Sequence, residues 1–368
     1  MSYQTAYNRW VGIGPYYAMF PTLFVENTIK QYTQPGDWIL DPFAGRASTV
    51  FIGSSLGRPS VGVEINPVGW VYGKAKLFPA TKEAVTKRLQ QICSDTGKPI
   101  SVDGDFQEFF DLCFSKKVLS FISSVRKNLD WKNSETDRTL MAIILVDLHG
   151  PKQRALSNQM RQSRAMAPDY SVNWWKSHKM TPPDIEPINF VQKKINWRYE
   201  KGLPESSDQS DVVLGDSTQV LNDLLEKHEK KFKLIFTSPP YIDVTDYHRD
   251  QWLRLWLLGE ELSYKRRTHK YQATFASVSE YEKLLTSVFQ KANQLVSDDG
   301  YVYVRTDARE NTFGITMNTL SESFPNWKHK VIEQPYSKNT QTALYGDKSA
   351  KPGEKDIEIG RASCRERV

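Results

Sequence analysis

The sequence predicts an α/β fold of the doubly wound class that carries one long, mostly helical and basic insertion. Two observations lead to this expectation: short runs of β-forming residues that end in turn-like clusters, and helix-like stretches between them. Such runs are typical of buried parallel strands, and their alternation with helices indicates a sheet covered by helices. The five expected strands are WILD at 38–41, SVGVEI at 60–65, DVVLGD at 211–216, KLIFTS at 233–238 and YVYVRTD at 301–307.

A long gap between the second and third expected strands, from 66 to 210, breaks this alternation. Helical periodicity predicts helices there at KEAVTKRLQQI and LMAIILVDLHG, and an irregular, basic stretch follows from 151 to 184. We therefore expect an insertion within the core. The expected division is a first part of the core at 1–75, a helical and basic insertion at 76–205, a second part of the core at 206–358 and a non-native tail at 359–368.

The composition favours an ordinary globular protein. Hydrophobic residues make up 39% of the 368 residues and charged residues 25%, a balance that can bury a full core. No apolar run is long enough to cross a membrane, and the polar start lacks a secretion signal, so we expect a cytoplasmic protein with no membrane partner. Three scattered cysteines predict neither a disulfide framework nor a zinc site, and no metal is expected.

Charge and the C-terminal end add two further expectations. The formal net charge is +6, so the global charge argues only weakly for a nucleic-acid partner, and local charge must carry that inference. The last ten residues, IGRASCRERV, fit no expected element. We expect them to be a foreign tail, with the natural C-terminus missing.

The segment from Asp41 to Thr49 lies where the first strand ends and a helix begins, which is where α/β sheets bind ligands. Gly45 within it would let the backbone approach a ligand closely. The second strand ends in Glu64, at the position where nucleotide-binding folds place an acidic acceptor for ribose hydroxyls. These residues predict a site for a cofactor that contains a nucleoside. The alternative is an ordinary strand-to-helix turn.

The sequence of residues 41–49 resembles the first motif of class I methyltransferases, which reads Asp-Pro-Phe-x-Gly-x-Gly-Thr in the DNA enzymes that methylate amino groups. Ala47 stands where that family has its second glycine. The resemblance implies a Rossmann-like methyltransferase sheet and S-adenosylmethionine as the cofactor, whereas a dinucleotide fits less well because Gly-x-Gly-x-x-Gly is absent. Phe20-Pro21 resembles the segment that holds the methionine moiety, and Asp216 resembles the contact to the adenine amino group. The expected cofactor-binding residues are Phe20, Pro21, Asp41, Phe43, Ala44, Gly45, Ser48, Thr49, Glu64, Asn66, Asp216 and Ser217.

A second motif, Thr-Ser-Pro-Pro-Tyr at 237–241, follows the fourth expected strand, where two consecutive prolines cannot serve sheet pairing. It resembles the Ser-Pro-Pro-Tyr motif of amino-methyltransferases. With the first motif, this resemblance spans nearly the whole chain outside the insertion. It identifies the catalytic residues as Ser238, Pro239, Pro240 and Tyr241.

The chemistry of amino methylation explains these residue types. An exocyclic amino nitrogen is a poor nucleophile because its lone pair is delocalised into the ring. Ser238 Oγ and the Pro239 carbonyl can accept hydrogen bonds from its two N–H groups and favour a pyramidal nitrogen, while Tyr241 would offer a face to an extruded base. Neither a metal nor a covalent intermediate is required.

The base itself is less constrained by the motif. Serine in the first position resembles cytosine-N4 enzymes more than adenine-N6 enzymes, so N4 is favoured and N6 is the alternative. The lack of a Pro-Cys pair with a nucleophilic cysteine argues against methylation at cytosine C5, which requires covalent attack on the ring.

An enzyme that acts on a base in duplex DNA needs cations for the phosphates and polar side chains for the base edges. The basic stretch of the insertion is the first candidate, where Asn158 could contact bases and Trp175 could stack on a base or pack inside the protein. Double-stranded DNA is the expected partner, and whether a restriction endonuclease acts beside it stays open. A solvated charged surface is the alternative. The expected DNA-binding residues are Arg161 and Arg164, and then Lys265, Arg266 and Arg267 from a second basic segment.

Two other functions stay open. Methyltransferases of RNA or of protein glutamine use a related Asn-Pro-Pro-Tyr motif, but Ser238 and the basic insertion favour DNA. A catalytically silent DNA-binding protein is the second alternative, and the intact motif residues argue against it. Binding of S-adenosylmethionine would separate a methyltransferase from a silent DNA-binding protein.

Overall fold

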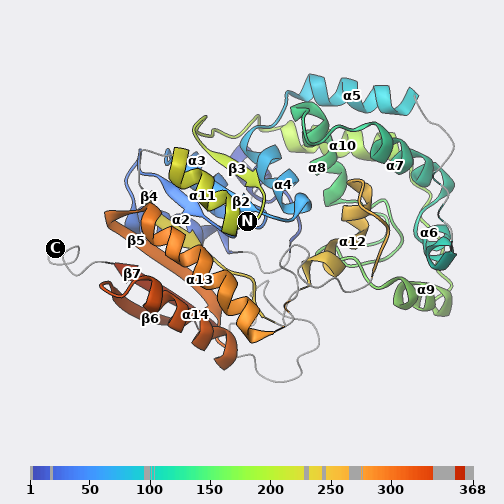
Figure 1. Ribbon diagram of the computed structural model, residues 1–368. Coiled ribbons are helices and arrows are strands. Elements are labelled where there is room, and N and C mark those ends of the chain that lie inside the picture. Colours follow the sequence, from blue (N-terminus) through green and yellow to red (C-terminus); the bar gives the residue numbers. More distant parts are fainter. Residues whose placement is uncertain are drawn as a thin grey trace. The chain divides into compact units, whose positions relative to one another are not determined.

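The computed structural model describes residues 3–16, 20–94, 100, 102, 104–227, 232–242, 246–264, 275, 277–334 and 353–360. They form two compact units, each assembled from segments that are distant in the sequence (Figure 1). The first, here called the helical unit, comprises 1–17, 74–204 and 247–266. The second, the sheet unit, comprises 18–73, 205–246 and 267–368.

The sheet unit contains a sheet of seven described strands in the order β3-β2-β1-β4-β5-β7-β6. Strands β1 to β5 pair in parallel, and β7 runs antiparallel to both of its neighbours. The expected α/β class is therefore confirmed. The strands are β1 Ile39–Asp41, β2 Ser60–Glu64, β3 Asp211–Leu214, β4 Phe232–Thr237, β5 Val296–Asp307, β6 Lys328–Gln334 and β7 Glu354–Gly360.

Both faces of this sheet are covered, which explains why its central strands are apolar throughout. Consecutive residues of a strand point to opposite faces. Ile235 of β4 belongs to a buried cluster built from β strands and the helices α11, α13 and α14, whereas the next residue, Phe236, stacks on Phe20 and contacts Phe24 of α2. The helices of the sheet unit are α2 Thr22–Tyr32, α3 Ser48–Ser55, α11 Ser217–Lys227, α13 Val278–Leu295 and α14 Glu310–Ser323, and α4 Pro67–Leu77 crosses into the helical unit.

The last two strands, β6 and β7, were not among the five strands expected from the sequence. β7 inserts between β5 and β6 and pairs along its whole length with both. Its last residues, Ile359 and Gly360, pair with Val302 and Tyr301, so the strand extends two residues into the segment set apart as a tail. Residues 361–368 lie outside the described part of the chain.

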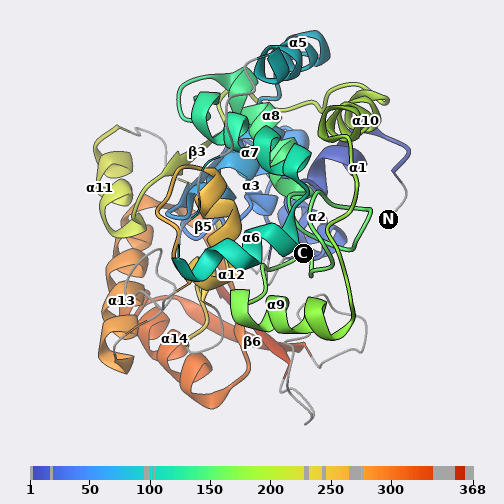
Figure 2. The same cartoon turned by 90° about the vertical axis from the view of Figure 1, so that its right-hand side faces the viewer.

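The helical unit contains nearly all of the expected insertion together with two segments from outside it, 1–17 and 247–266 (Figure 2). Residues 1–17 and 247–266 were assigned to the core by the sequence, and the contacts group them with the helices instead. None of the described helices, in either unit, is long and apolar enough to span a membrane. The helices of this unit are α1 Ala6–Val11, α5 Lys82–Ser94, the 3-10 helix Gly104–Phe106, α6 Gln107–Cys113, α7 Lys116–Asn128, α8 Glu135–Val146, α9 Pro168–Ser177, α10 Pro187–Tyr199 and α12 Tyr247–Leu257.

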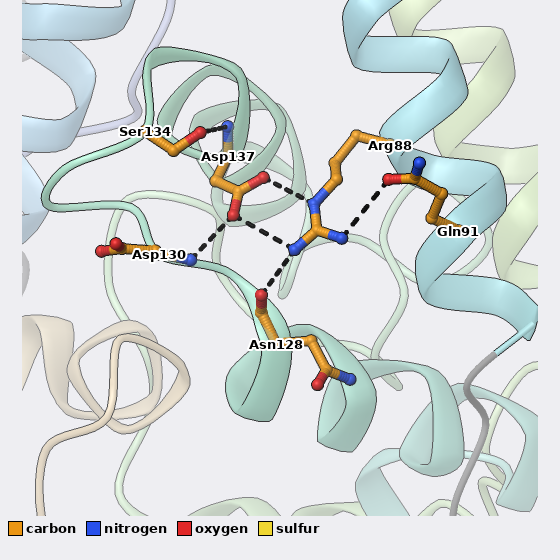
Figure 3. Close-up of polar contacts among 6 residues, drawn as sticks. All are labelled: Arg88, Gln91, Asn128, Asp130, Ser134 and Asp137. Carbon is orange, nitrogen blue, oxygen red and sulfur yellow. Dashed lines mark hydrogen bonds and ion pairs between the residues drawn. The ribbon is translucent and has the colours of Figure 1, made fainter.

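One arginine joins three of these helices (Figure 3). Arg88 of α5 donates from Nε to Asp137 Oδ1 of α8 at 2.7 Å and from Nη2 to the Asn128 carbonyl at the end of α7 at 2.6 Å. Asp137 also accepts from the backbone of Asp130, and Ser134 caps the helix that contains it. The buried carboxylate thus has a full set of donors, which is the condition under which a buried charge is tolerated.

Candidate active site

The order of the strands brings the two sequence motifs together. From β1 the chain proceeds to β2 and β3 on one side, while β4 and β5 lie on the other, so the boundary between β1 and β4 is the topological switch point of the sheet. Ligands of doubly wound folds bind at the carboxyl ends of the strands beside such a point. The segment 41–49 leaves β1 there, and 238–241 leaves β4.

A direct hydrogen bond fixes the two loops to each other. Thr237 is the last residue of β4 and Asp41 is the last residue of β1. The hydroxyl Oγ1 of Thr237 donates to Asp41 Oδ1 at 2.6 Å. Asp41 is 2% exposed and also accepts from the Phe43 amide at 3.2 Å. Burial raises the pKa of Asp41 to about 6, although the hydrogen bond from Thr237 opposes this. Asp41 therefore links the first motif to the catalytic strand.

The turn after β1 uses two residues in the left-handed region. Gly45 has φ 55°, and Ala47, which replaces the second glycine of the family motif, has φ 57° and ψ 45°. For alanine this conformation costs about 1 kcal/mol or more, so the turn is held at some strain. The methyl group of Ala47 is fully buried, and a Cβ on Gly73 of α4 would lie 2.9 Å from it.

Glycine is also required where α4 crosses the turn. A Cβ built on Gly69 would lie 2.6 Å from the Gly45 carbonyl oxygen and 3.0 Å from Glu64 Cγ. Gly62 of β2 is similar, because its Cβ would lie 2.8 Å from Ala44 Cβ. The motif turn is thus packed tightly against β2 and α4.

We predict opposite effects of alanine at two helical glycines. Gly69→Ala should lower the free energy of unfolding by about 1–3 kcal/mol, because the added methyl must displace the Gly45 backbone. Gly314→Ala in α14 has open space around it and should raise that free energy by about 0.5–1 kcal/mol, as helix propensity dictates. Urea unfolding of both variants checks this, and equal effects would contradict the packing described.

Glu64 ends β2 beside the same turn. It is 7% exposed and accepts from the Asn66 amide at 2.7 Å. Burial raises the pKa of Glu64 to about 8. Hydrogen bonds from the backbones of Asn66 and Gly45 lower this pKa, whereas the charge of the nearby Asp41 raises it further. Asn66 Oδ1 accepts from the Val68 amide at 3.0 Å at the start of α4, while its buried Nδ2 has no hydrogen-bond partner in the described part of the chain.

The remaining expected cofactor residues border this region of the sheet unit. Asp216 Oδ1 accepts from the amide and the hydroxyl of Thr218 at 2.8 Å each, which starts α11. Ser217 Oγ donates to the Pro42 carbonyl and so fastens that helix to the first motif. Ser48 and Thr49 are buried in the first turn of α3. Of the pair that starts α2, Pro21 is exposed and Phe20 stacks on Phe236 at 5.1 Å.

The motif expected to be catalytic forms a compact loop after β4. Pro239 and Pro240 are buried, Ser238 is half-buried and Tyr241 is 8% exposed. The Ser238 hydroxyl donates to the Tyr241 hydroxyl at 3.3 Å. The ring of Tyr241 was expected to present a stacking face, but most of its surface is already covered by protein, and its hydroxyl lies at Ser238.

The sequence analysis missed one charged residue of this region. Arg305, inside the apolar strand β5, lies 3.6 Å from the ring centroid of Phe24 and 5.7 Å from that of Phe20. Its guanidinium pairs with Asp356 of β7 at 2.6 Å and with Glu354 at 3.2 Å. The available signal was an arginine within a run of strand-forming residues, and its partners lie in a strand that was not predicted.

The expected DNA-binding residues fall in the helical unit or outside the described residues. Arg164 pairs with Asp250 at 3.9 Å, and Arg161 is half-buried. Asn158 is fully buried and donates to the Leu112 carbonyl, so the expectation that it contacts bases is wrong for this structure. Trp175 is also fully buried, which agrees with the packing alternative. The residues that lie outside the described part of the chain are Lys265, Arg266 and Arg267.

Known proteins resemble this chain at several levels. A family model described as DNA methylase matches residues 2–68. The Type II methyltransferase M.MjaII of Methanocaldococcus jannaschii is 35% identical over 390 residues, which cover 82% of this chain and 72% of that protein. The Type II methyltransferase M.BsoBI of Geobacillus stearothermophilus is 24% identical over 70% of this chain, which spans only 55% of that relative. Among solved structures, an rRNA methylase of Streptococcus thermophilus matches 93% of this chain and 97% of its own with a TM-score of 0.36 and 4% identity, too weak a likeness to bear on function.

Proposed function

Since this chain belongs to the DNA methylase family, we propose that it transfers a methyl group from S-adenosylmethionine to an exocyclic amino group of a base in DNA, with cytosine N4 favoured. The observation that carries this proposal is the junction of β1 and β4. There the hydrogen bond from Thr237 to Asp41 holds the expected cofactor turn beside the Ser-Pro-Pro-Tyr loop.

The residues at this junction fit S-adenosylmethionine. Glu64 offers a buried carboxylate to ribose hydroxyls, and Asn66 Nδ2 is a buried donor that lacks a partner among the described residues. Gly45 and Gly69 leave room that a Cβ would fill. When bound, the cofactor supplies an electrophilic methyl group on a sulfonium. The twelve expected cofactor residues of the sheet unit stay our assignment for this site.

Ser238 is the residue that prepares the amino nitrogen. Because its hydroxyl proton is donated to Tyr241, the lone pairs of Ser238 Oγ are left to accept from the amino group of the base. The Pro239 carbonyl, held in a loop whose two prolines fix the backbone, accepts from the second amino hydrogen. Both acceptors act most strongly as positive charge develops on the nitrogen. This step needs no metal ligand and no covalent bond to the protein.

Cytosine N4 is proposed over adenine N6 because serine stands first in the motif, a form that resembles the N4 enzymes. Both bases present the same pair of amino hydrogens to Ser238 and Pro239. The chemistry of the loop is compatible with either, and the surrounding pocket for the base decides between them.

Duplex DNA is the proposed substrate, in a cytoplasmic setting and with a restriction endonuclease as an open partner. Arg161 and Arg164 of the helical unit supply two of the cations for phosphates. Lys265, Arg266 and Arg267, which follow α12 in the sequence, supply three more.

The product of the reaction tests this proposal. The full chain is incubated with methyl-labelled S-adenosylmethionine and duplex DNA, the DNA is digested to nucleosides, and the labelled nucleoside is identified by mass and retention. We expect N4-methylcytosine. N6-methyladenine would overturn the choice of base only, while 5-methylcytosine, or label found only on RNA or protein, would overturn the mechanism.

A further inference from the structure

The loop that joins α8 to α9, residues 147–167, is here called the basic loop. After Asp147, its first residue, it has no acidic residue, and it contains the four cations Lys152, Arg154, Arg161 and Arg164. Charged loops are usually solvated and mobile, because nothing anchors their backbone. The basic loop differs, since several of its residues are buried and hydrogen-bonded.

Three polar residues form the buried frame of the basic loop. His149, Ser157 and Asn158 each have 0% exposure. Ser157 Oγ accepts from the Gly150 amide and donates to the Asn158 carbonyl at 2.6 Å, while Asn158 Nδ2 donates to the Leu112 carbonyl at 2.9 Å. Ser157 and Asn158, whose hydrogen bonds are made, therefore favour one backbone conformation of this frame.

A buried arginine links the same loop to the end of α8. Arg254 of α12 is fully buried and donates from Nε to the Leu145 carbonyl of α8 at 2.8 Å and from Nη2 to the Gln162 carbonyl of the loop at 2.7 Å. Its Nη1 donates to Gln251 Oε1 at 2.8 Å. Removing a cation from water is costly, so its hydrogen bond to the Gln162 carbonyl is a strong restraint on the loop.

Between His149 and Ser157 of this frame, residues 151–154 form a tight, exposed turn. The Arg154 amide donates to the Pro151 carbonyl at 2.9 Å, and the Lys152 amide donates to Gln159 Oε1 at 2.9 Å. Gln153 has φ 68°, a left-handed conformation that glycine or asparagine adopts more readily. Gln153 and Arg154 are exposed, and their side chains have no partner among the described residues.

We propose that this turn reads base edges in a groove of the DNA substrate, with Gln153 and Arg154 as the reading side chains. Glutamine can bind adenine N6 and N7, and arginine can bind guanine O6 and N7, each with two hydrogen bonds. A turn that is already held in one conformation loses little entropy on binding. Arg164 is occupied by Asp250 and Arg161 is half-buried, so neither is as well placed to reach a base.

This inference rests on the proposed function, and its test keeps the two apart. The full chain and its variants methylate a pool of random-sequence duplexes, and the modified positions are mapped. Gln153→Gly suits the left-handed turn and removes the whole side chain together with its amide, while Arg154→Lys keeps the charge and removes the planar fork. Lys193→Ala, at an exposed site on α10 of the same unit, is the control.

We expect the sequence preference of each turn variant to fall by roughly tenfold to a hundredfold at one or two base pairs. The midpoint temperature of thermal unfolding should be unchanged, or slightly raised for Gln153→Gly. Lys193→Ala should keep the wild-type preference. An unchanged preference in both turn variants overturns the inference, as does a uniform loss of activity without any change of preference. If the wild-type chain methylates no DNA, the proposed function fails, and the role of the turn is then tested by its affinity for duplex DNA. Equal duplex affinities of Arg154→Ala and Lys193→Ala would overturn the inference about the turn.

Discussion

Ser238→Ala is expected to lower turnover by about 10²–10³ while the affinity for S-adenosylmethionine stays unchanged. The substitution removes the oxygen that accepts from the amino group as positive charge develops there, and it removes nothing from the side of the site formed by Glu64 and Gly45. Ser238 is half-buried and packs little, so the fold should be kept. Single-turnover rates and cofactor titration by calorimetry measure the two quantities separately.

Tyr241→Phe is the matched variant for this experiment. It keeps the buried ring and removes only the hydroxyl to which Ser238 donates at 3.3 Å. The serine proton is then free to point toward the base, so we expect a smaller loss of turnover, about tenfold, as for one neutral hydrogen bond. A loss in Tyr241→Phe that equals the loss in Ser238→Ala would place the essential group on the tyrosine instead.

Glu64→Ala is expected to weaken the binding of S-adenosylmethionine by about 1–3 kcal/mol, because it removes the carboxylate assigned to the ribose hydroxyls. The wild-type affinity should also depend on pH. Burial raises the pKa of Glu64 to about 8 in the free protein, and hydrogen bonds from hydroxyls favour the ionised form, so binding releases a proton. Affinity should therefore rise with pH below about 8 and level off above it.

From pH 7 to 9 Asp41, with a pKa of about 6, is already ionised, so Glu64 is the carboxyl of the pair that titrates there. Glu64→Gln cannot ionise and should lose the part of the pH dependence that Glu64 contributes, while the part due to the cofactor's own amino group stays. Calorimetry in two buffers of different ionisation enthalpy would count the protons released. A wild-type affinity that is flat or falls between pH 7 and 8 would remove Glu64 from the ribose position.

Several parts of the fold could be predicted from local sequence. The five parallel strands follow from short apolar runs, and the start of α8 follows from a serine that caps Asp137. β6 and β7 could not be predicted in the same way, because β7 contains alternating charged residues that become buried only between two partner strands. The helical unit also takes 1–17 and 247–266, a grouping that depends on contacts between segments far apart in the sequence.

The sequence by itself determined the two motifs and the acidic end of β2, since turn residues, consecutive prolines and a carboxylate at a strand end express their chemistry locally. Only the tertiary structure decided that Thr237 donates to Asp41, that Arg305 pairs with Asp356, and that Arg254 fixes the basic loop. Each of these contacts joins residues that are distant along the chain. Their pairing is set by strand order and helix packing, which minimise the free energy of the whole fold rather than of any one segment.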